Sequence, residues 1–355
     1  MNDTLYVTKD FNDKLDVTKK YKVLAINGNK SKHIIKTMMD YRPSDGYNKS
    51  FKYQLINSSS WFNMMYEFYF DSDSIKTITL VDSTLHSIKV VCRMLDATPV
   101  KDKKGIDYDT QFGDYVKIKY FEGKVALLKI SSFHGLPIIG KMINDNHYKK
   151  ALKEIEDKNI QTTIIDLRNN TGGDAKSGYR LVSHFINEKH KVLIQRNKGN
   201  TFKYATLKSK IRLILNAIFG NLFSGRMPQF KDRKSFVTIK PKQKIFTGKV
   251  YVLSNGFTLS TASNVASIFK YKTNAIIAGE ETGGGERTLN AYFFPKIKLP
   301  NSKIEIQIPQ YNIDLNLDGT IGSGVVPDIK LTNNFQNIIT EGDWMLNELI
   351  QIINE

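Results

Sequence analysis

Two glycine-containing loops carry the residues whose types and spacing could do chemistry. One of them, VLSNGFTLSTAS (252–263), places Ser260 at the start of a predicted helix, after a buried strand over residues 250–253. Unpaired N–H groups and the helix dipole favour negative charge at such a start. A serine there can expose its hydroxyl while the Thr261 N–H points at the same oxygen site. Taken alone, a serine in this position is more often simply a helix N-cap.

The other loop, DLRNNTGG (166–173), follows a continuous apolar strand predicted over residues 162–167. Sites in parallel sheets form where the strands end at their carboxyl edge. Glycines there, Gly172 and Gly173, let backbone N–H groups converge on developing negative charge, as an oxyanion hole requires. A tight strand-to-helix turn that needs glycine for its geometry explains this loop equally well.

The elements that must position these loops alternate between strand and helix after residue 113. Strands are predicted over 114–120, 124–133, 162–167, 250–253 and 275–278, and helices over 146–158, 174–187 and 260–270. This alternation predicts a parallel sheet covered by helices. An amphipathic helix over residues 341–353 is expected to close the chain.

The N-terminal third has a different organisation. A strand is predicted over residues 22–27, a helix over 31–40, and a hairpin from the strands 75–81 and 87–91. A polar, irregular stretch follows over residues 96–112, with Pro, Gly and many charges. It predicts a boundary between a first domain over residues 1–100 and a second over 101–355.

Composition excludes several classes of protein. The net charge of +17 permits binding to nucleic acid, but the lysines are scattered and no nucleic-acid motif is present, so we expect no such partner. Cys92 is the only cysteine, which excludes an intramolecular disulfide. Its flanks read as a strand, so a packing role is expected. No His, Asp or Glu cluster has metal-ligand spacing, so neither a metal nor a cofactor is predicted.

Targeting segments are not recognisable in the sequence. The N-terminus has no basic-plus-apolar signal region. The longest apolar stretch, residues 211–223, is interrupted by Arg212, Asn216 and Asn221 and is too short to span a bilayer. We therefore expect a soluble chain without a transmembrane segment, and the oligomeric state is left open.

The order of the motifs is more specific than any one of them. DLRNNTGG is followed after about 80 residues by VYVLSNGFTLSTAS, then by IIAGEETGGG (276–285), LPNSKIEIQIP (299–309) and GVVPDI (324–329). This succession resembles the C-terminal processing (tail-specific) serine proteases and the related tricorn core and interphotoreceptor retinoid-binding protein modules. The resemblance covers residues 124–329. Residues 19–34 look like the second half of the PDZ-like domain that many members carry.

The resemblance implies an α/β fold with a crotonase-like core and a small PDZ-like α+β domain before it. It implies a serine endopeptidase that acts on extended or unfolded polypeptide and uses no cofactor. The nucleophile falls on Ser260, and the oxyanion donors fall on the backbone around Gly172 and Gly173 and on Thr261. Relatives act mostly outside the cytoplasm, which implies an extracytoplasmic location.

The general base is the point at which the sequence departs from the family. Where the bacterial tail-specific branch has a lysine, this chain has Gly285, and the upstream histidine of the tricorn-like branch has no counterpart. The chain is then a fragment of a longer protein, or has another base, or is inactive. His134 follows the strand 124–133 and is the candidate base, although a loop histidine without a role is the alternative. An impaired or truncated member that binds peptide or ligand is the alternative function.

Charged residues near the two loops have less specific roles. Asp166 and Arg168 are expected to tie a strand to neighbouring loops. Glu280 and Glu281 lie close to the expected groove, where one of them could orient a base or cap a helix.

Overall fold

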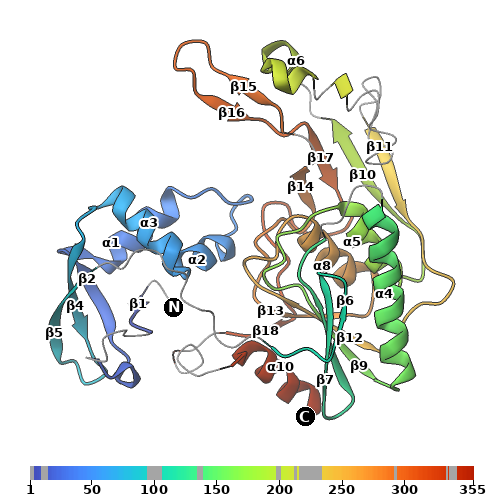
Figure 1. Cartoon of the computed structure of the whole chain (residues 1–355), viewed down its shortest axis with the longest axis horizontal. Helices are drawn as coiled ribbons and strands as arrows, with labels where there is room; N and C mark the ends of the chain where they lie inside the picture. The colour runs from blue at the N-terminus through green and yellow to red at the C-terminus, as the bar shows by residue number, and fades with distance from the viewer. Residues whose placement is uncertain are drawn as a thin grey trace. The chain divides into compact units, whose positions relative to one another are not determined.

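The computed structural model forms two compact units (Figure 1). The first contains residues 1–44, 49–107 and 330–355, and the second contains residues 45–48 and 108–329. The structure describes residues 4–8, 15–93, 106–133, 139–196, 201–211, 214–215, 234–291, 294–332, 335 and 342–355. The sequence placed residues 330–355 with the second domain, whereas in the structure they group with the first unit.

An antiparallel sheet and three helices build the first unit. The strands, in the order β1-β2-β4-β5 with β3 on β2, are β1 (Leu5–Tyr6), β2 (Lys22–Ile26), β3 (Asn29–Lys30), β4 (Ile75–Val81) and β5 (Ser87–Arg93). The helices are α1 (Ser31–Asp40), α2 (Ser50–Ile56) and α3 (Ser59–Tyr69), and a 3₁₀ turn, η1 (Val17–Lys19), precedes β2. Ile34, Met38, Tyr66 and Leu80 fill the core between helices and sheet. The predicted strand, helix and hairpin are confirmed here.

A seven-stranded mixed sheet forms the centre of the second unit. Its order is β18-β13-β12-β9-β8-β7-β6, from strands β6 (Thr110–Phe112), β7 (Val116–Phe121), β8 (Val125–Ile130), β9 (Thr162–Asp166), β12 (Lys249–Ser254), β13 (Ile276–Gly279) and β18 (Ile329–Lys330). The strands β8, β9, β12 and β13 run parallel, as predicted. The strands β6, β7 and β8 run antiparallel because short turns join them. The fold is therefore mixed α/β.

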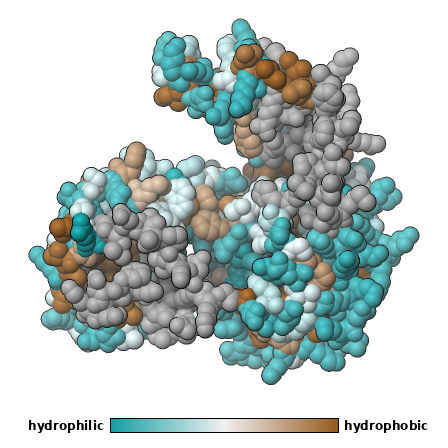
Figure 2. Space-filling view, viewed as in Figure 1, coloured by the Kyte–Doolittle hydropathy of each residue, from teal (hydrophilic) through white to brown (hydrophobic). Residues whose placement is uncertain are grey.

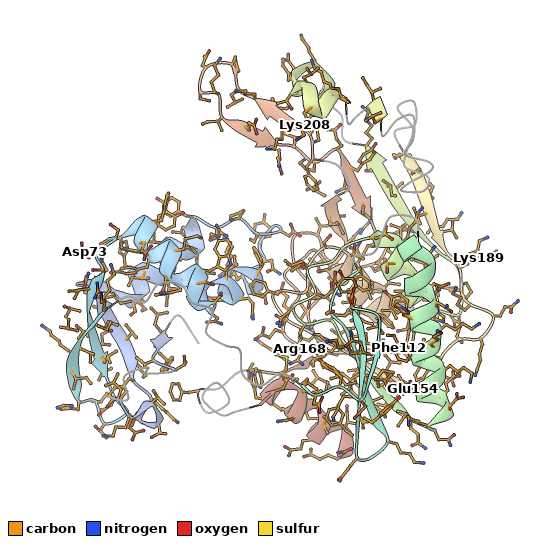
Figure 3. The ribbon with its side chains drawn as sticks, viewed as in Figure 1. Asp73, Phe112, Glu154, Arg168, Lys189 and Lys208 are labelled. Carbon is orange, nitrogen blue, oxygen red and sulfur yellow. The ribbon has the colours of Figure 1, made fainter. Side chains whose placement is uncertain are left out.

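Helices α4 (Ile139–Asp157), α5 (Ala175–Val182) and α8 (Thr261–Lys272) accompany this sheet. Glu154 on α4 accepts hydrogen bonds from Tyr120 on β7 and Thr110 on β6, which ties the helix to the antiparallel edge (Figure 3). Strand β8 is buried along almost its whole length, as expected of a central strand. Helix α5 ends at Val182, five residues before the predicted end at 187.

A smaller antiparallel sheet completes the second unit, in the order β11-β10-β17-β14. Its strands are β10 (His190–Arg196), β11 (Lys234–Ile239), β14 (Thr288–Ala291) and β17 (Tyr311–Asp314). Beyond it lie the hairpin β15 (Lys296–Lys298) and β16 (Glu305–Gln307) and the short helix α6 (Thr201–Tyr204). Apolar side chains gather on this hairpin and around α6 in Figure 2, including Tyr204, Leu207 and Ile304.

The last helix, α10 (Trp344–Asn354), agrees closely with the helix predicted over residues 341–353. Asp343 caps it, since its side chain accepts the Leu346 N–H at 3.1 Å. No helix within the described ranges is long and apolar enough to cross a membrane. Most of the apolar stretch 211–223 lies outside those ranges.

Candidate active site

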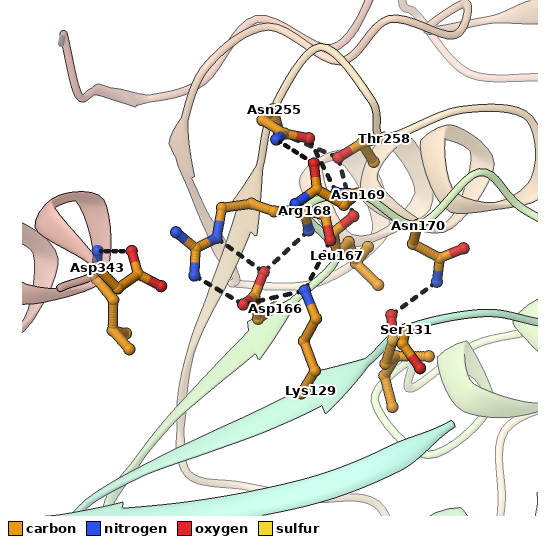
Figure 4. Close-up of polar contacts among 12 residues, drawn as sticks. Lys129, Ser131, Asp166, Leu167, Arg168, Asn169, Asn170, Asn255, Thr258 and Asp343 are labelled. Carbon is orange, nitrogen blue, oxygen red and sulfur yellow. Dashed lines mark hydrogen bonds and ion pairs between the residues drawn. The ribbon is translucent and has the colours of Figure 1, made fainter. Parts of the chain in front are cut away.

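The two predicted loops lie side by side at the carboxyl edge of β9 and β12. Two asparagines bond them reciprocally, because the Asn255 side chain accepts the Asn169 N–H at 3.0 Å and donates to Asn169 Oδ1 at 2.9 Å (Figure 4). Thr258 Oγ1 donates to the Leu167 carbonyl at 3.0 Å. The parallel register of β9 with β12 delivers both loops to one edge, and these side-chain bonds then fix their relative position.

Asn170 holds the glycine turn of the first loop. It is fully buried, donates through Nδ2 to the Ile130 carbonyl at 2.8 Å, and accepts the Gly172 N–H on Oδ1 at 2.9 Å. Its own carbonyl accepts the Leu259 N–H at 3.0 Å. One residue thus connects the end of β8, the Gly172 turn and the residue before Ser260.

Ser260 occupies a strained turn immediately before α8. Its φ of 52° and ψ of −124° lie in a region that residues with a Cβ rarely adopt. The residue is exposed, and its side chain makes no capping hydrogen bond to the helix. A serine that served only as an N-cap would spend its hydroxyl on the N–H groups of the first turn. The capping interpretation therefore does not describe this residue.

The glycine turn packs directly against this serine. A Cβ on Gly172, whose φ is +100°, would lie 2.8 Å from Ser260 Cβ and 3.0 Å from the Thr261 nitrogen. Thr261 Oγ1 donates to the Gly173 carbonyl at 2.9 Å and joins the start of α8 to the same turn. Glycine at 172 is required by both its backbone angle and this close approach.

Two backbone amides at this turn have no acceptor among the residues that the structure describes: those of Gly173 and Thr261. The Gly172 N–H differs, since Asn170 Oδ1 accepts it. Unpaired N–H groups beside an exposed hydroxyl are what stabilisation of a developing oxyanion requires. The donor role of Gly172, Gly173 and Thr261 stays a prediction.

The GEETGGG loop closes the other side of the Ser260 turn. The N–H groups of Gly283 and Gly284 both donate to the Thr258 carbonyl, at 3.1 and 3.2 Å. A Cβ on Gly284 would lie 2.8 Å from the Ser260 nitrogen. A Cβ on Gly285 would lie 2.3 Å from the Thr288 carbonyl oxygen. A lysine at position 285 would therefore need a different backbone.

Buried charges beneath the loops have a structural role. Asp166 is 1% exposed and pairs with Arg168 at 2.8 Å and Lys129 at 3.2 Å (Figures 3 and 4). Burial alone would raise the pKa of Asp166, but these two cations hold it at about 2. Burial raises the pKa of Glu280, which accepts a hydrogen bond from the Gly256 backbone.

The base is not located by the described residues. His134 lies outside them, although its neighbour Phe133 donates its N–H to the Gly172 carbonyl at 2.9 Å. No hydrogen bond of the Ser260 hydroxyl to another described side chain is found. Within the same ranges, no group of three His, Cys, Asp or Glu side chains could hold a metal ion.

Sequence reasoning did not single out the asparagines that assemble the site. Asn169, Asn170 and Asn255 each sit beside a glycine or another asparagine in a turn, where their side chains commonly bond to backbone. That local signal marks a turn. It cannot reveal that the partners lie on another loop 86 residues away, as they do for Asn169 and Asn255.

Residues 124–331, more than half of the chain, match the family model described as peptidase family S41. The chain belongs to this family of serine peptidases, whose substrates are polypeptides. The resemblance to C-terminal processing proteases is thereby confirmed. No curated protein sequence matches the chain.

Solved structures share the fold at low sequence identity. The crystal structure of mature CPAF is 13% identical with a TM-score of 0.61, over 98% of this chain and 79% of that chain. Mature CPAF complexed with lactacystin is 14% identical with a TM-score of 0.58, over 98% and 80%. The photosystem II D1 C-terminal processing protease is 13% identical with a TM-score of 0.38, over 88% and 63%.

Proposed function

We propose that this chain is a serine endopeptidase that cleaves extended or unfolded polypeptides, with Ser260 as its nucleophile. The observation that carries the proposal is the exposed Ser260 in a strained turn packed on Gly172, beside the unpaired amides of Gly173 and Thr261. Strain of this kind persists only where the surroundings impose it, and it clusters at functional sites. The proposal includes a crotonase-like core and a PDZ-like N-terminal domain.

In the proposed reaction, Ser260 Oγ attacks the scissile carbonyl and forms an acyl ester, while the peptide nitrogen leaves with a proton. The carbonyl oxygen becomes an oxyanion in the tetrahedral intermediate, where the amides of Gly173 and Thr261 donate to it. Gly172 joins them if its bond to Asn170 opens during the reaction. A water then hydrolyses the ester.

A base must accept the serine proton, because a serine hydroxyl is a weak nucleophile at neutral pH. His134 is the candidate, supported by the bond of Phe133 to Gly172 next to Ser260. The substrate would lie as an added strand beside the sheet, since an extended peptide satisfies its backbone groups in that way.

Ser260→Ala tests the nucleophile. We expect turnover of casein or a fluorogenic peptide to fall by about 10³-fold or more, because covalent catalysis ends with the hydroxyl. Ser302→Ala, an exposed serine of the same unit, is the matched control and should keep wild-type activity. Equal turnover by wild type and Ser260→Ala would refute the assignment.

A second candidate function is binding of peptide or ligand without cleavage. The observation that favours it is the Ser260 hydroxyl, which has no base bonded to it within the described residues, together with a glycine at position 285. A fluorophosphonate probe separates the two functions. Labelling of wild type at Ser260 excludes a binding-only protein, and absence of labelling together with saturable peptide binding supports one.

A further inference from the structure

The segment Asp45–Asn48 lies between α1 and α2 in the sequence, yet it belongs to the second unit, together with the site. Asn48 is 2% exposed, and its Nδ2 donates to Glu281 Oε1 at 3.0 Å and to the Thr282 carbonyl at 2.7 Å. Asp45 Oδ2 accepts the Gly285 N–H at 3.1 Å. Both ends of the segment are therefore bonded to the GEETGGG loop.

The middle of the segment is fitted by backbone against backbone. The Tyr47 N–H donates to the Gly322 carbonyl at 2.7 Å. A Cβ on Gly46, whose φ is +53°, would lie 2.3 Å from Gly322 Cα. Neighbouring Gly324 donates its N–H to Glu281 Oε1 at 2.8 Å, so one carboxylate oxygen joins this second loop to Asn48. A contact that excludes side chains on both sides is a specific one.

The GEETGGG loop transmits this contact to the nucleophile turn. Gly283 and Gly284 donate to the Thr258 carbonyl, and Ser263 Oγ donates to the same oxygen at 2.8 Å. Gly284 leaves no room for a side chain between the loop and the Ser260 nitrogen. The path from Asn48 to Ser260 is thus continuous and consists of hydrogen bonds and close packing.

The strained angles of Ser260 make this support consequential. A residue in that region relaxes unless its neighbours hold it. Removal of the Asn48 amide would leave the buried Thr282 carbonyl and one oxygen of Glu281 without that donor, and a buried acceptor that loses its partner is costly. The loop would then move toward new partners and release one side of the Ser260 turn.

We propose that Asn48 is a positioning residue for Ser260, which it holds in its reactive conformation through Glu281 and the Gly283–Gly285 turn. Its effect on reactivity rests on the proposed function, whereas its effect on the loop does not. It touches no reacting atom, so it sets how much of the protein has the reactive turn.

Asn48→Ala in the full chain tests this role. Hydrogen exchange of peptides over residues 281–286 and 258–262 should become about tenfold faster, the change expected for one lost buried hydrogen bond. Fluorophosphonate labelling of Ser260 and kcat should fall by about tenfold, with KM within about twofold, because the substrate groove is unchanged.

Lys49→Ala is the matched control, since the next side chain is exposed and the Lys49 carbonyl keeps its bond from the Tyr53 N–H. It should match wild type in both exchange and labelling. Asn48→Asp sets two carboxylates against each other and should loosen the loop further. Combined with Glu281→Gln, whose amide can donate to Asp at 48, it should recover part of the protection.

Each outcome decides the inference separately from the proposed function. Unchanged exchange over 281–286 in Asn48→Ala overturns it, as does faster exchange over that loop with full labelling of Ser260. If wild type is not labelled at all, the proposed function fails, and exchange over 258–262 alone judges the positioning role. If Asn48→Ala does not fold, Glu281→Gln, which retains the acceptor oxygen, carries the same measurements with a smaller expected change.

Discussion

Gly172 and Ser260 show how the reactive turn is built from single residues. Each has a positive φ, and their backbones approach so closely that only a hydrogen fits on Gly172. The result is a hydroxyl turned away from its own helix and toward unpaired amides. Such pre-arranged donors need no reorganisation when charge develops on a substrate oxygen.

Gly172→Ala should therefore lose reactivity more than stability. We expect labelling of Ser260 to slow about 10²-fold, as for the loss of an oxyanion donor, and the free energy of unfolding to fall by about 2 kcal/mol. Gly28→Ala is a matched control: its φ is +80°, but nothing lies within 4 Å of the added Cβ. It should be destabilised by about 1 kcal/mol with labelling intact. Equal labelling losses in the two variants would contradict this account.

Asp166 gives a pH dependence with a defined sign. Its pKa is about 2 in the folded protein, below about 3.9 for an unfolded aspartate. The stability that it contributes is therefore present above pH 4 and is lost as the pH falls toward 2.

Asp166→Asn should lower the free energy of unfolding at pH 7 by about 3 kcal/mol, because Arg168 and Lys129 would be left without a counter-charge. Urea unfolding of both proteins from pH 7 down to pH 2.5 measures the difference. We expect the gap to stay constant to about pH 4 and to narrow below it. A gap that does not change with pH would argue against the buried pair.

At the scale of elements, the crossing of α5 over α8 sets the position of the nucleophile helix. Gly178 permits the close approach, since a Cβ there would lie 2.6 Å from Thr261 Cγ2 and 2.8 Å from Val265 Cγ2. Thr261 also bonds Gly173, so α8 is fixed at its first residue from two directions. The sequence predicted both helices, but their contact was not deducible from their separate periodicities.

Gly178→Ala should destabilise the protein by about 1–2 kcal/mol through overpacking, although alanine is the better helix former by about 1 kcal/mol. The double variant Gly178→Ala/Val265→Ala removes one of the two clashes and should regain part of the loss. Thermal unfolding with Ser260 labelling in parallel measures both effects. Stabilisation by Gly178→Ala would show that the helices separate readily.

At the scale of the whole molecule, the net charge of +17 should influence the choice of substrate. A field of this sign raises the encounter rate with acidic chains and is screened by salt. If the chain cleaves peptides, kcat/KM for an acidic peptide should fall about tenfold between about 50 and 500 mM salt. A neutral peptide with the same scissile residues should change little. The same salt dependence for both would remove charge from the account.

The sequence by itself determined the parallel strands β8, β9, β12 and β13, the helices between them, and the residues that face one another at the site. These features depend on local signals: apolar runs, helix-start chemistry and glycine turns, read in a family-like order. Only the tertiary structure decided the antiparallel addition of β6 and β7, the grouping of α10 with the first unit, and the entry of Asp45–Asn48 into the second.

The physical reason is sequence separation. Asn48 lies 233 residues from Glu281, and no local pattern encodes a bond whose energy exists only after both units of chain have folded. The backbone angles of Ser260 are of the same kind, because Gly172 and Gly284 impose them from outside its own helix. The sequence therefore identified the serine, and the tertiary structure decided that its hydroxyl is not a helix cap.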